Sequence, residues 1–175
     1  MNEKRRLVVG VLALAVAACG AGERPAPRVG PPGTIAISLE DTLGETFSLE
    51  IIEVRLDGRI ALQCGAGGAK LDARSPVVLY EGSAGPGEHE ISLRLVYRGN
   101  GAGIFSYLQG YTFDVKSTHE VDLPPAGIVS VQAIAREGGG PMTPLEERPQ
   151  VRWEELGAGD LPPGPIGCPT GSRTP

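Results

Sequence analysis

The chain is poor in the side chains that most often carry chemistry. Its 175 residues include two histidines, three cysteines and one tryptophan, and aromatic residues make up only 5%. No Cys-x-x-Cys pair occurs, and the two histidines, His89 and His119, stand far apart without a metal-ligand motif. No basic run follows the first six residues, so nucleic-acid binding has no support. We expect no metal and no cofactor.

Nucleophile and phosphate-binding motifs are also absent. Gly82-Ser83-Ala84-Gly85 lacks the spacing of a Gly-x-Ser-x-Gly elbow. The glycine-rich segment 99–103 is not followed by a helical pattern, which a phosphate-binding loop requires. Carboxylates are plentiful, which is typical of a solvated surface. A pair of catalytic carboxylates, as in glycosidases, is kept as an alternative. We therefore expect a protein that is not an enzyme, with an enzyme kept as an alternative.

The first 19 residues are the most informative part of the chain. Lys4, Arg5 and Arg6 are followed by a mostly apolar stretch, Leu7–Ala18. This stretch is shorter than the roughly 20 residues of a permanent membrane span. A positive start, a short apolar run and small residues at its end are typical of a secretory signal. We expect residues 1–18 to be a signal peptide.

The residues Val16-Ala17-Ala18-Cys19 resemble the bacterial lipobox, the site that lipoprotein signal peptidase cleaves. The resemblance implies cleavage before Cys19, diacylglycerol on its thiol and a third acyl chain on the new amine. Two acyl chains already give stable anchoring, so the membrane is an expected partner. Gly20 stands where an inner-membrane retention signal has Asp, which favours the outer membrane. The alternative is an ordinary secretory signal with a chance cysteine at its end.

Proline and glycine divide the rest of the chain. Residues 20–33 contain four Gly and four Pro, and residues 138–175 contain eight of each. We expect 19–33 to be a lipidated, disordered tether of up to roughly 40 Å. The segment 34–137 is expected to be one domain. Residues 138–175 are then a Pro/Gly-rich tail, with 143–156 packed on the domain.

The central segment alternates apolar and polar residues with a period of two. Such alternation predicts strands with one solvated face, whereas no segment after residue 18 shows a helical period. We expect an all-β fold: a single two-sheet antiparallel β-sandwich, immunoglobulin-like or transthyretin-like, of about seven or eight strands. The residues expected to face inward are Ile35, Ile37, Leu39, Ile91, Leu93, Leu95, Tyr97, Tyr111, Phe113, Val115, Val129, Val131 and Ala133.

The segment 47–64 changes the parity of its apolar residues near Ile51-Ile52. An inward-facing row cannot change parity within a regular strand, so we expect either a bulge there or the end of one strand. A hairpin follows at Asp57-Gly58. A two-residue loop there would mix the two faces, so we predict a three-residue loop, 56–58, that pairs Val54 with Ile60.

Two cysteines remain once Cys19 is lipidated. In an oxidising compartment Cys64 and Cys168 can form a disulfide that fastens the tail to the domain. The alternative is two free thiols. Trp153 has two interpretations as well: an apolar packing contact of the tail, or an anchor for a protein partner.

Two further segments, 107–113 and 144–149, resemble small, functionally unassigned lipoproteins of high-GC Gram-negative bacteria. Some of those carry an automatic label of dihydrolipoamide acetyltransferase. That family's catalytic pattern, His-x-x-x-Asp-Gly, follows neither His89 nor His119, and its Asp-Lys-Ala lipoyl turn is absent. The acetyltransferase activity is therefore not carried over.

These features predict an exported, lipid-anchored protein of the cell envelope, on the periplasmic face or at the cell surface. We expect a non-catalytic binding or structural module whose partner is an envelope protein or a glycan. In a carbohydrate- or peptidoglycan-binding alternative, Tyr97, Tyr107 and Tyr111 would stack on sugars. His89 and His119 are expected to be separate, solvent-facing strand residues.

Overall fold

The computed structural model describes residues 29–43, 47–69, 71, 76–100, 109–140, 142–144, 147–157, 160, 162–163 and 166–169. Cys19, the expected signal peptide and most of the tether lie outside the described residues. Within the described part, no helix is long and apolar enough to cross a membrane.

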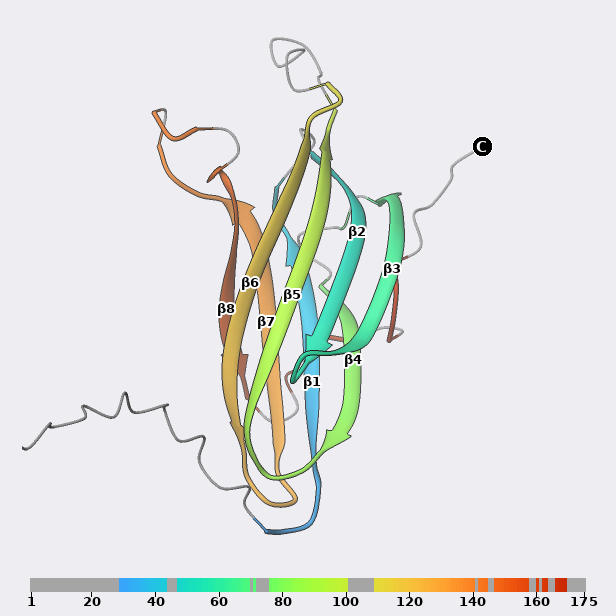
Figure 1. Cartoon of the computed structure of the whole chain (residues 1–175), viewed down its shortest axis with the longest axis vertical. Helices are drawn as coiled ribbons and strands as arrows, with labels where there is room; N and C mark the ends of the chain where they lie inside the picture. Colours follow the sequence, from blue (N-terminus) through green and yellow to red (C-terminus); the bar gives the residue numbers. More distant parts are fainter. Residues whose placement is uncertain are drawn as a thin grey trace, which may run out of the picture.

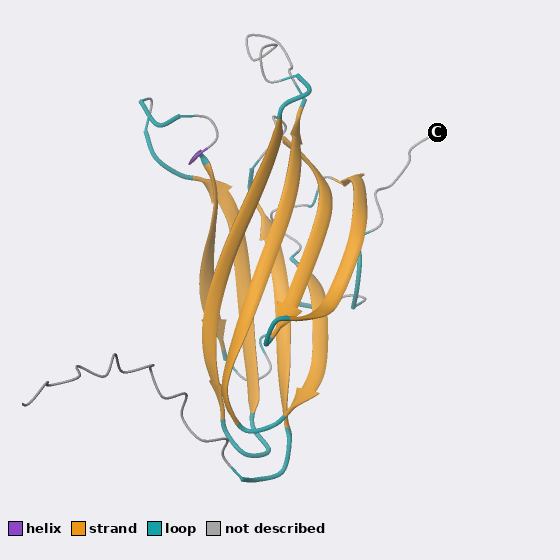
Figure 2. Ribbon diagram, in the orientation of Figure 1, coloured by secondary structure: helices purple, strands orange, loops and turns teal. Residues whose placement is uncertain are grey.

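The fold is all-β, as the alternation predicted. Two sheets of four strands pack face to face, with β6, β5, β2 and β3 in one layer and β8, β7, β1 and β4 in the other (Figure 1). Most of the described residues are strand, and most of the turns lie at the two ends of the sandwich, whereas the β2–β3 turn lies partway along it (Figure 2). The strands are β1 (Gly33–Asp41), β2 (Phe47–Leu56), β3 (Arg59–Ala69), β4 (Val77–Ala84), β5 (Gly87–Gly99), β6 (Thr112–Leu123), β7 (Ile128–Glu137) and β8 (Pro149–Leu156).

The strand order distinguishes the two expected arrangements. The sheets have the orders β4-β1-β7-β8 and β3-β2-β5-β6. In an immunoglobulin-like sandwich the first strand pairs with the second, which is not the case here. The transthyretin-like alternative therefore remains.

One strand pair corrects the prediction of a wholly antiparallel sandwich. β1 and β7 are parallel, whereas every other pair is antiparallel. The turn 124–127 carries the chain from one sheet to the other, and Thr34 N donates to Gly127 O at 2.9 Å. β7 thus starts at the same end of the sandwich as β1, which makes the pair parallel.

The core lies between the sheets and includes ten of the thirteen predicted inward-facing residues, but Tyr111 is 63% exposed and the prediction for it is wrong. Ile35, Ile37, Leu95 and Val131 are fully buried, and Phe47 stacks edge-to-face on Phe113 with ring centroids 5.1 Å apart. Complete burial of one such side chain stabilises the fold by about 1.5–3 kcal/mol. Repeated over eight strands, this term holds the sandwich together.

The outer faces of the two sheets differ. On β5 and β6, Arg94 and Asp114 form an exposed ion pair at 2.9 Å, as expected of a solvated face. On β1 and β7 the residues between the inward-facing ones point to the outer face of the sheet. Three of them, Ala36, Ser38 and Ser130, are nevertheless buried. The middle of this second sheet is therefore covered on both sides, and the prediction of one solvated face is wrong there.

The β2–β3 segment contains a bulge and a two-residue loop. The register shifts between Leu49 and Ile51 against both β3 and β5, which confirms a bulge close to the parity change. The predicted three-residue loop is wrong. Leu56 pairs with Arg59 around Asp57-Gly58, and a second register shift after Val54 restores the inward row.

The sandwich extends beyond the expected boundary at residue 137. β8 pairs with β7 over its full length, from Pro149 with Glu137 to Leu156 with Ser130. The segment 149–156 is therefore an edge strand of the sheet, not a tail packed on a finished domain. An edge strand hydrogen-bonds to one neighbouring strand only, here β7. The weak apolar alternation of 149–156 is therefore enough for it to form β8.

Candidate binding cleft

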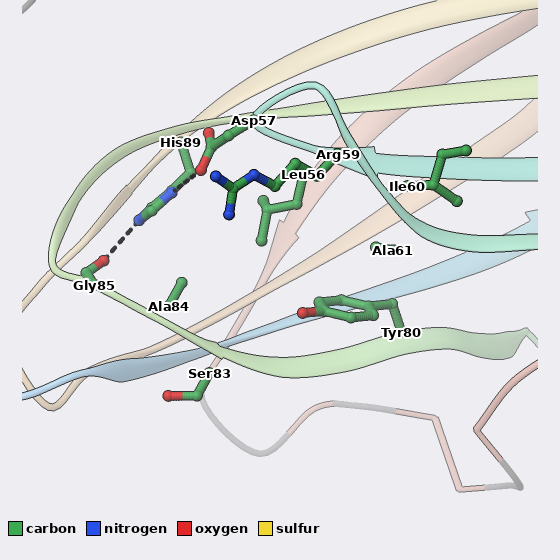
Figure 3. A pocket seen from close by; sticks show the side chains of 10 residues that line it. All are labelled: Leu56, Asp57, Arg59, Ile60, Ala61, Tyr80, Ser83, Ala84, Gly85 and His89. Carbon is green, nitrogen blue, oxygen red and sulfur yellow. Dashed lines mark hydrogen bonds and ion pairs between the residues drawn. The ribbon is translucent and has the colours of Figure 1, made fainter.

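A cleft of about 520 Å³ opens between the two sheets at the edge formed by β3 and β4. Its lining comes from three places that are distant in the sequence: the β2–β3 hairpin, the end of β4 and the start of β5 (Figure 3). The lining residues are Leu56, Asp57, Arg59, Ile60, Ala61, Tyr80, Ser83, Ala84, Gly85 and His89.

The hairpin that forms one wall is held by its turn and by β5. Asp57 and Gly58 both have positive φ, 52° and 76°, the pattern of a tight hairpin turn that matches the strand twist. Asp57 N donates to Glu90 O at 2.9 Å, and Glu90 N donates to Asp57 Oδ1 at 3.0 Å. The hairpin tip is therefore hydrogen-bonded to the neighbouring strand.

His89 ties this hairpin to the turn between β4 and β5. Its Nδ1 lies 2.8 Å from Asp57 Oδ2 and its Nε2 lies 2.6 Å from Gly85 O. A carboxylate and a carbonyl both accept hydrogen bonds, so the contacts are fully satisfied only when both ring nitrogens carry protons. Figure 3 shows the ring between these two partners.

The surroundings of His89 favour its charged form. Partial burial lowers the pKa of His89, but the hydrogen bonds to Asp57 and Gly85 and the charge of Asp57 outweigh it. The pKa of His89 therefore lies above its usual value of 6.5. A protonated His89 neutralises Asp57 and closes one end of the cleft with an ion pair.

Arg59 and Tyr80 present polar groups to the interior of the cleft. In Figure 3 both side chains lie between the hairpin and β4. Among the described residues, no hydrogen bond or ion pair engages the Arg59 guanidinium. The Tyr80 ring lies against the backbone of Gly82, where an added Cβ would come within 2.0 Å of the tyrosine oxygen.

Ser83 does not complete a nucleophilic pair with His89. Its hydroxyl points away from the cleft, on the other side of β4 (Figure 3). Both nitrogens of His89 are already occupied by Asp57 and Gly85. The arrangement suits binding: a preformed wall, an aromatic ring, a guanidinium and apolar side chains.

The far end of the same edge is held by the C-terminal segment. Ile166 forms a bridge with Val78 of β4, and Gly167 N donates to Val78 O at 2.9 Å. Cys168 is bonded to Cys64 of β3, with Cα atoms 6.1 Å apart. Of the two alternatives for these cysteines, the structure contains the disulfide, which links the two sheets across their open edge.

Trp153 lies at the opposite edge of the sandwich, between β6 and β8. Its ring stacks on His119 with centroids 5.3 Å apart and planes 10° apart. Its Nε1 donates to Ser117 Oγ at 2.9 Å. The packing interpretation accounts for these contacts, since both the ring and its N–H are engaged within the domain.

The expectation that both histidines face solvent is wrong. The side chains of His89 and His119 are 12% and 26% exposed. They belong to neighbouring strands, yet one turns to the hairpin and the other to Trp153. No group of three or more potential metal ligands occurs in the described part of the chain.

The three tyrosines proposed for sugar stacking are not those of the cleft. Tyr97 is completely buried in the core, where burial and the charge of Asp41 raise its pKa. Tyr111 is 63% exposed beyond the cleft, and Tyr107 lies outside the described residues. Sequence reasoning missed Tyr80 and Arg59. The available signal was the position of Arg59 directly after the hairpin turn.

Compared with known proteins, the chain matches no protein-family model, no curated protein and no solved structure.

Proposed function

We propose that the protein is a lipid-anchored lipoprotein of the cell envelope whose sandwich acts as a non-catalytic binding module. Cys19 and the segment before it support the anchor. The cleft between β3 and β4 supports binding and is the observation that carries the proposal. Ligand sites are typically concave, largely preformed and lined by apolar groups with a few polar ones.

The position of the cleft agrees with a tethered module. Gly30, where the tether joins the domain, lies close to Pro125 and Pro86, in the β6–β7 and β4–β5 turns. The cleft adjoins the same end of the sandwich, because Gly85 and His89 line it. The expected tether, with its reach of up to roughly 40 Å, then holds this end of the sandwich near the membrane.

The anchor is tested by mass spectrometry of the mature protein and by cell fractionation. We expect a chain that begins at acylated Cys19 and remains with the outer membrane. The Cys19→Ser variant should be released into a soluble fraction or remain uncleaved by lipoprotein signal peptidase. Recovery of an intact, unacylated 175-residue chain from the cytosol would refute the anchor.

The binding site is tested separately by photo-crosslinking in cells. A photoreactive residue at Ile60, which is 53% exposed in the cleft, should capture one recurrent envelope component. The same residue at Ile128, which is 56% exposed and outside the cleft, is the matched control. Equal capture at both positions, or none at Ile60, would contradict a binding role for the cleft.

A further inference from the structure

We infer that the cleft recognises a saccharide that carries a carboxylate, with Arg59 binding the carboxylate and Tyr80 stacking on the sugar ring. The inference rests on the proposed binding function and names its ligand class. It depends on three features of the cleft: an unneutralised cation, an aromatic face held in place, and walls of mixed polarity.

The cation is Arg59, the first residue of β3. It is exposed and carries no ion pair within the described part of the chain. The nearest acid of the lining, Asp57, is already bound by His89 and by the backbone of Glu90. Because the Asp57 carboxylate is held by these two partners and forms no ion pair with Arg59, the guanidinium is left for a ligand. A planar guanidinium can bind a carboxylate through two parallel hydrogen bonds.

The aromatic face is Tyr80, on the strand opposite Arg59. Gly82 lacks a side chain, so the ring lies against its backbone, over the face of β4 that is turned to the hairpin. One face of the ring is then turned to the cleft (Figure 3). An aromatic ring with a polar tip offers an apolar surface to the C–H groups of a sugar and a hydroxyl to its oxygens.

The remaining lining favours a sugar over a purely apolar acid. Leu56, Ala61 and Ala84 are apolar, but the cleft is bounded by the ion pair of His89 and Asp57 and lies at the surface. A fatty chain would need a deeper apolar pocket to bury its length. A single sugar ring carries both hydroxyl groups and apolar C–H surface. These can contact the polar and the apolar residues of the cleft at the same time.

The test is calorimetric titration of the full chain, purified in detergent, with a trimer of hexuronic acid. The matched probe is the same trimer with its carboxylates reduced to alcohols. We expect the acidic trimer to bind about tenfold more tightly, which is the effect of one charge-assisted hydrogen bond. Equal binding of both trimers would overturn the carboxylate assignment and leave a neutral sugar site.

Three variants locate the effect. Arg59→Ala should remove the preference for the acidic trimer, and Arg59→Lys should keep part of it. Gly82→Ala should displace Tyr80 and weaken both trimers by a similar factor. The controls are Arg98→Ala, on the exposed end of β5, and Gly65→Ala, where an added Cβ meets nothing closer than 3.8 Å. Weakening by either control equal to that by Arg59→Ala would overturn the assignment.

Two further titrations test whether the cleft binds any anion and which kind of glycan supplies the ligand. Inorganic phosphate that displaces the trimer completely at equal concentration would show a simple anion site and overturn the saccharide. Soluble muropeptides in place of the trimer distinguish cell-wall glycan from other acidic polysaccharides, and tighter binding of either supports the inference. If neither glycan binds while Ile60 captures an envelope protein, the saccharide is refuted and the binding module stands.

Discussion

The two open edges of the sandwich are closed by different means. At the β6–β8 edge, Trp153 packs on His119 and bonds to Ser117, so side chains alone fill the space. At the β3–β4 edge, the Cys64–Cys168 disulfide and the Ile166–Val78 bridge hold one end, and the other end stays open as the cleft. One edge is therefore closed by side-chain packing, whereas the other is held at one end by a covalent link between β3 and the C-terminal segment that pairs with β4.

The largest expected effect comes from removing the link at the β3–β4 edge. The double variant Cys64→Ser/Cys168→Ser should lower the free energy of unfolding by about 4 kcal/mol, because the disulfide closes a long loop in the unfolded chain. Its sequence separation is 104 residues. Urea denaturation of the wild type with and without reductant provides the matched comparison. A loss below about 1 kcal/mol would show that this edge does not depend on the disulfide.

Removal of Trp153 tests the edge that is closed by packing. Trp153→Ala should cost about 3 kcal/mol, since it leaves a space between β6 and β8. Trp153→Phe should cost less, about 1 kcal/mol, mainly for the hydrogen bond to Ser117. Far-ultraviolet circular dichroism during urea denaturation measures both. Equal losses for the two variants would mean that the hydrogen bond, not the ring, closes this edge.

The hairpin wall of the cleft depends on backbone conformation. Gly58 has φ of 76°, so Gly58→Ala should lower stability by about 1–2 kcal/mol although no atom lies within 4 Å of the added Cβ. Gly85→Ala is the control. Its Cβ also meets open space, but its φ is not in the left-handed range, so we expect little change. A cost at Gly85 as large as that at Gly58 would rule out the turn as the cause.

The smallest expected effect is the pH dependence of the closed end of the cleft. The pKa of His89 is raised in the folded state, so its contribution to stability is present below pH 6.5 and is lost as the pH rises through the folded-state pKa. The effect is small because the partner Asp57 is half exposed and screened by water. Urea midpoints from pH 6 to 9 measure the contribution.

Variants of the two histidines show which residue causes the decline in stability with rising pH. His89→Gln should remove the decline in stability above pH 6.5. His119→Gln, on the other edge, should lower stability through its contact with Trp153 and keep the decline. A decline that survives in His89→Gln and disappears in His119→Gln would transfer the effect to the other edge.

Local sequence patterns predicted most of the core but not every register. The alternation of Ile35, Ile37 and Leu39 identified the buried row of β1, because side chains of a strand point alternately to its two faces. The same reasoning rejected the two-residue turn at Asp57-Gly58, since it mixed the faces. The register shift after Val54 allows a two-residue turn at Asp57-Gly58 and still keeps the apolar residues of the hairpin facing the core. No local sequence pattern predicted this shift.

The cleft could not be predicted from the sequence. Arg59, Tyr80 and His89 belong to three strands in two sheets, and their proximity depends on how the sheets meet at one edge. The role of 149–156 as β8 was missed for a related reason. An edge strand is defined by the partner it finds, here β7, more than by its own alternation.

The sequence by itself determined the all-β class, most of the inward rows and the change of parity near Ile51, because these follow from side-chain alternation within single strands. The tertiary structure alone decided the parallel pairing of β1 with β7, the disulfide between Cys64 and Cys168, and the cleft. Each of these depends on contacts between residues far apart in the chain. Long-range contacts are set by the packing of whole sheets, whereas a local pattern specifies only which face of a strand is buried.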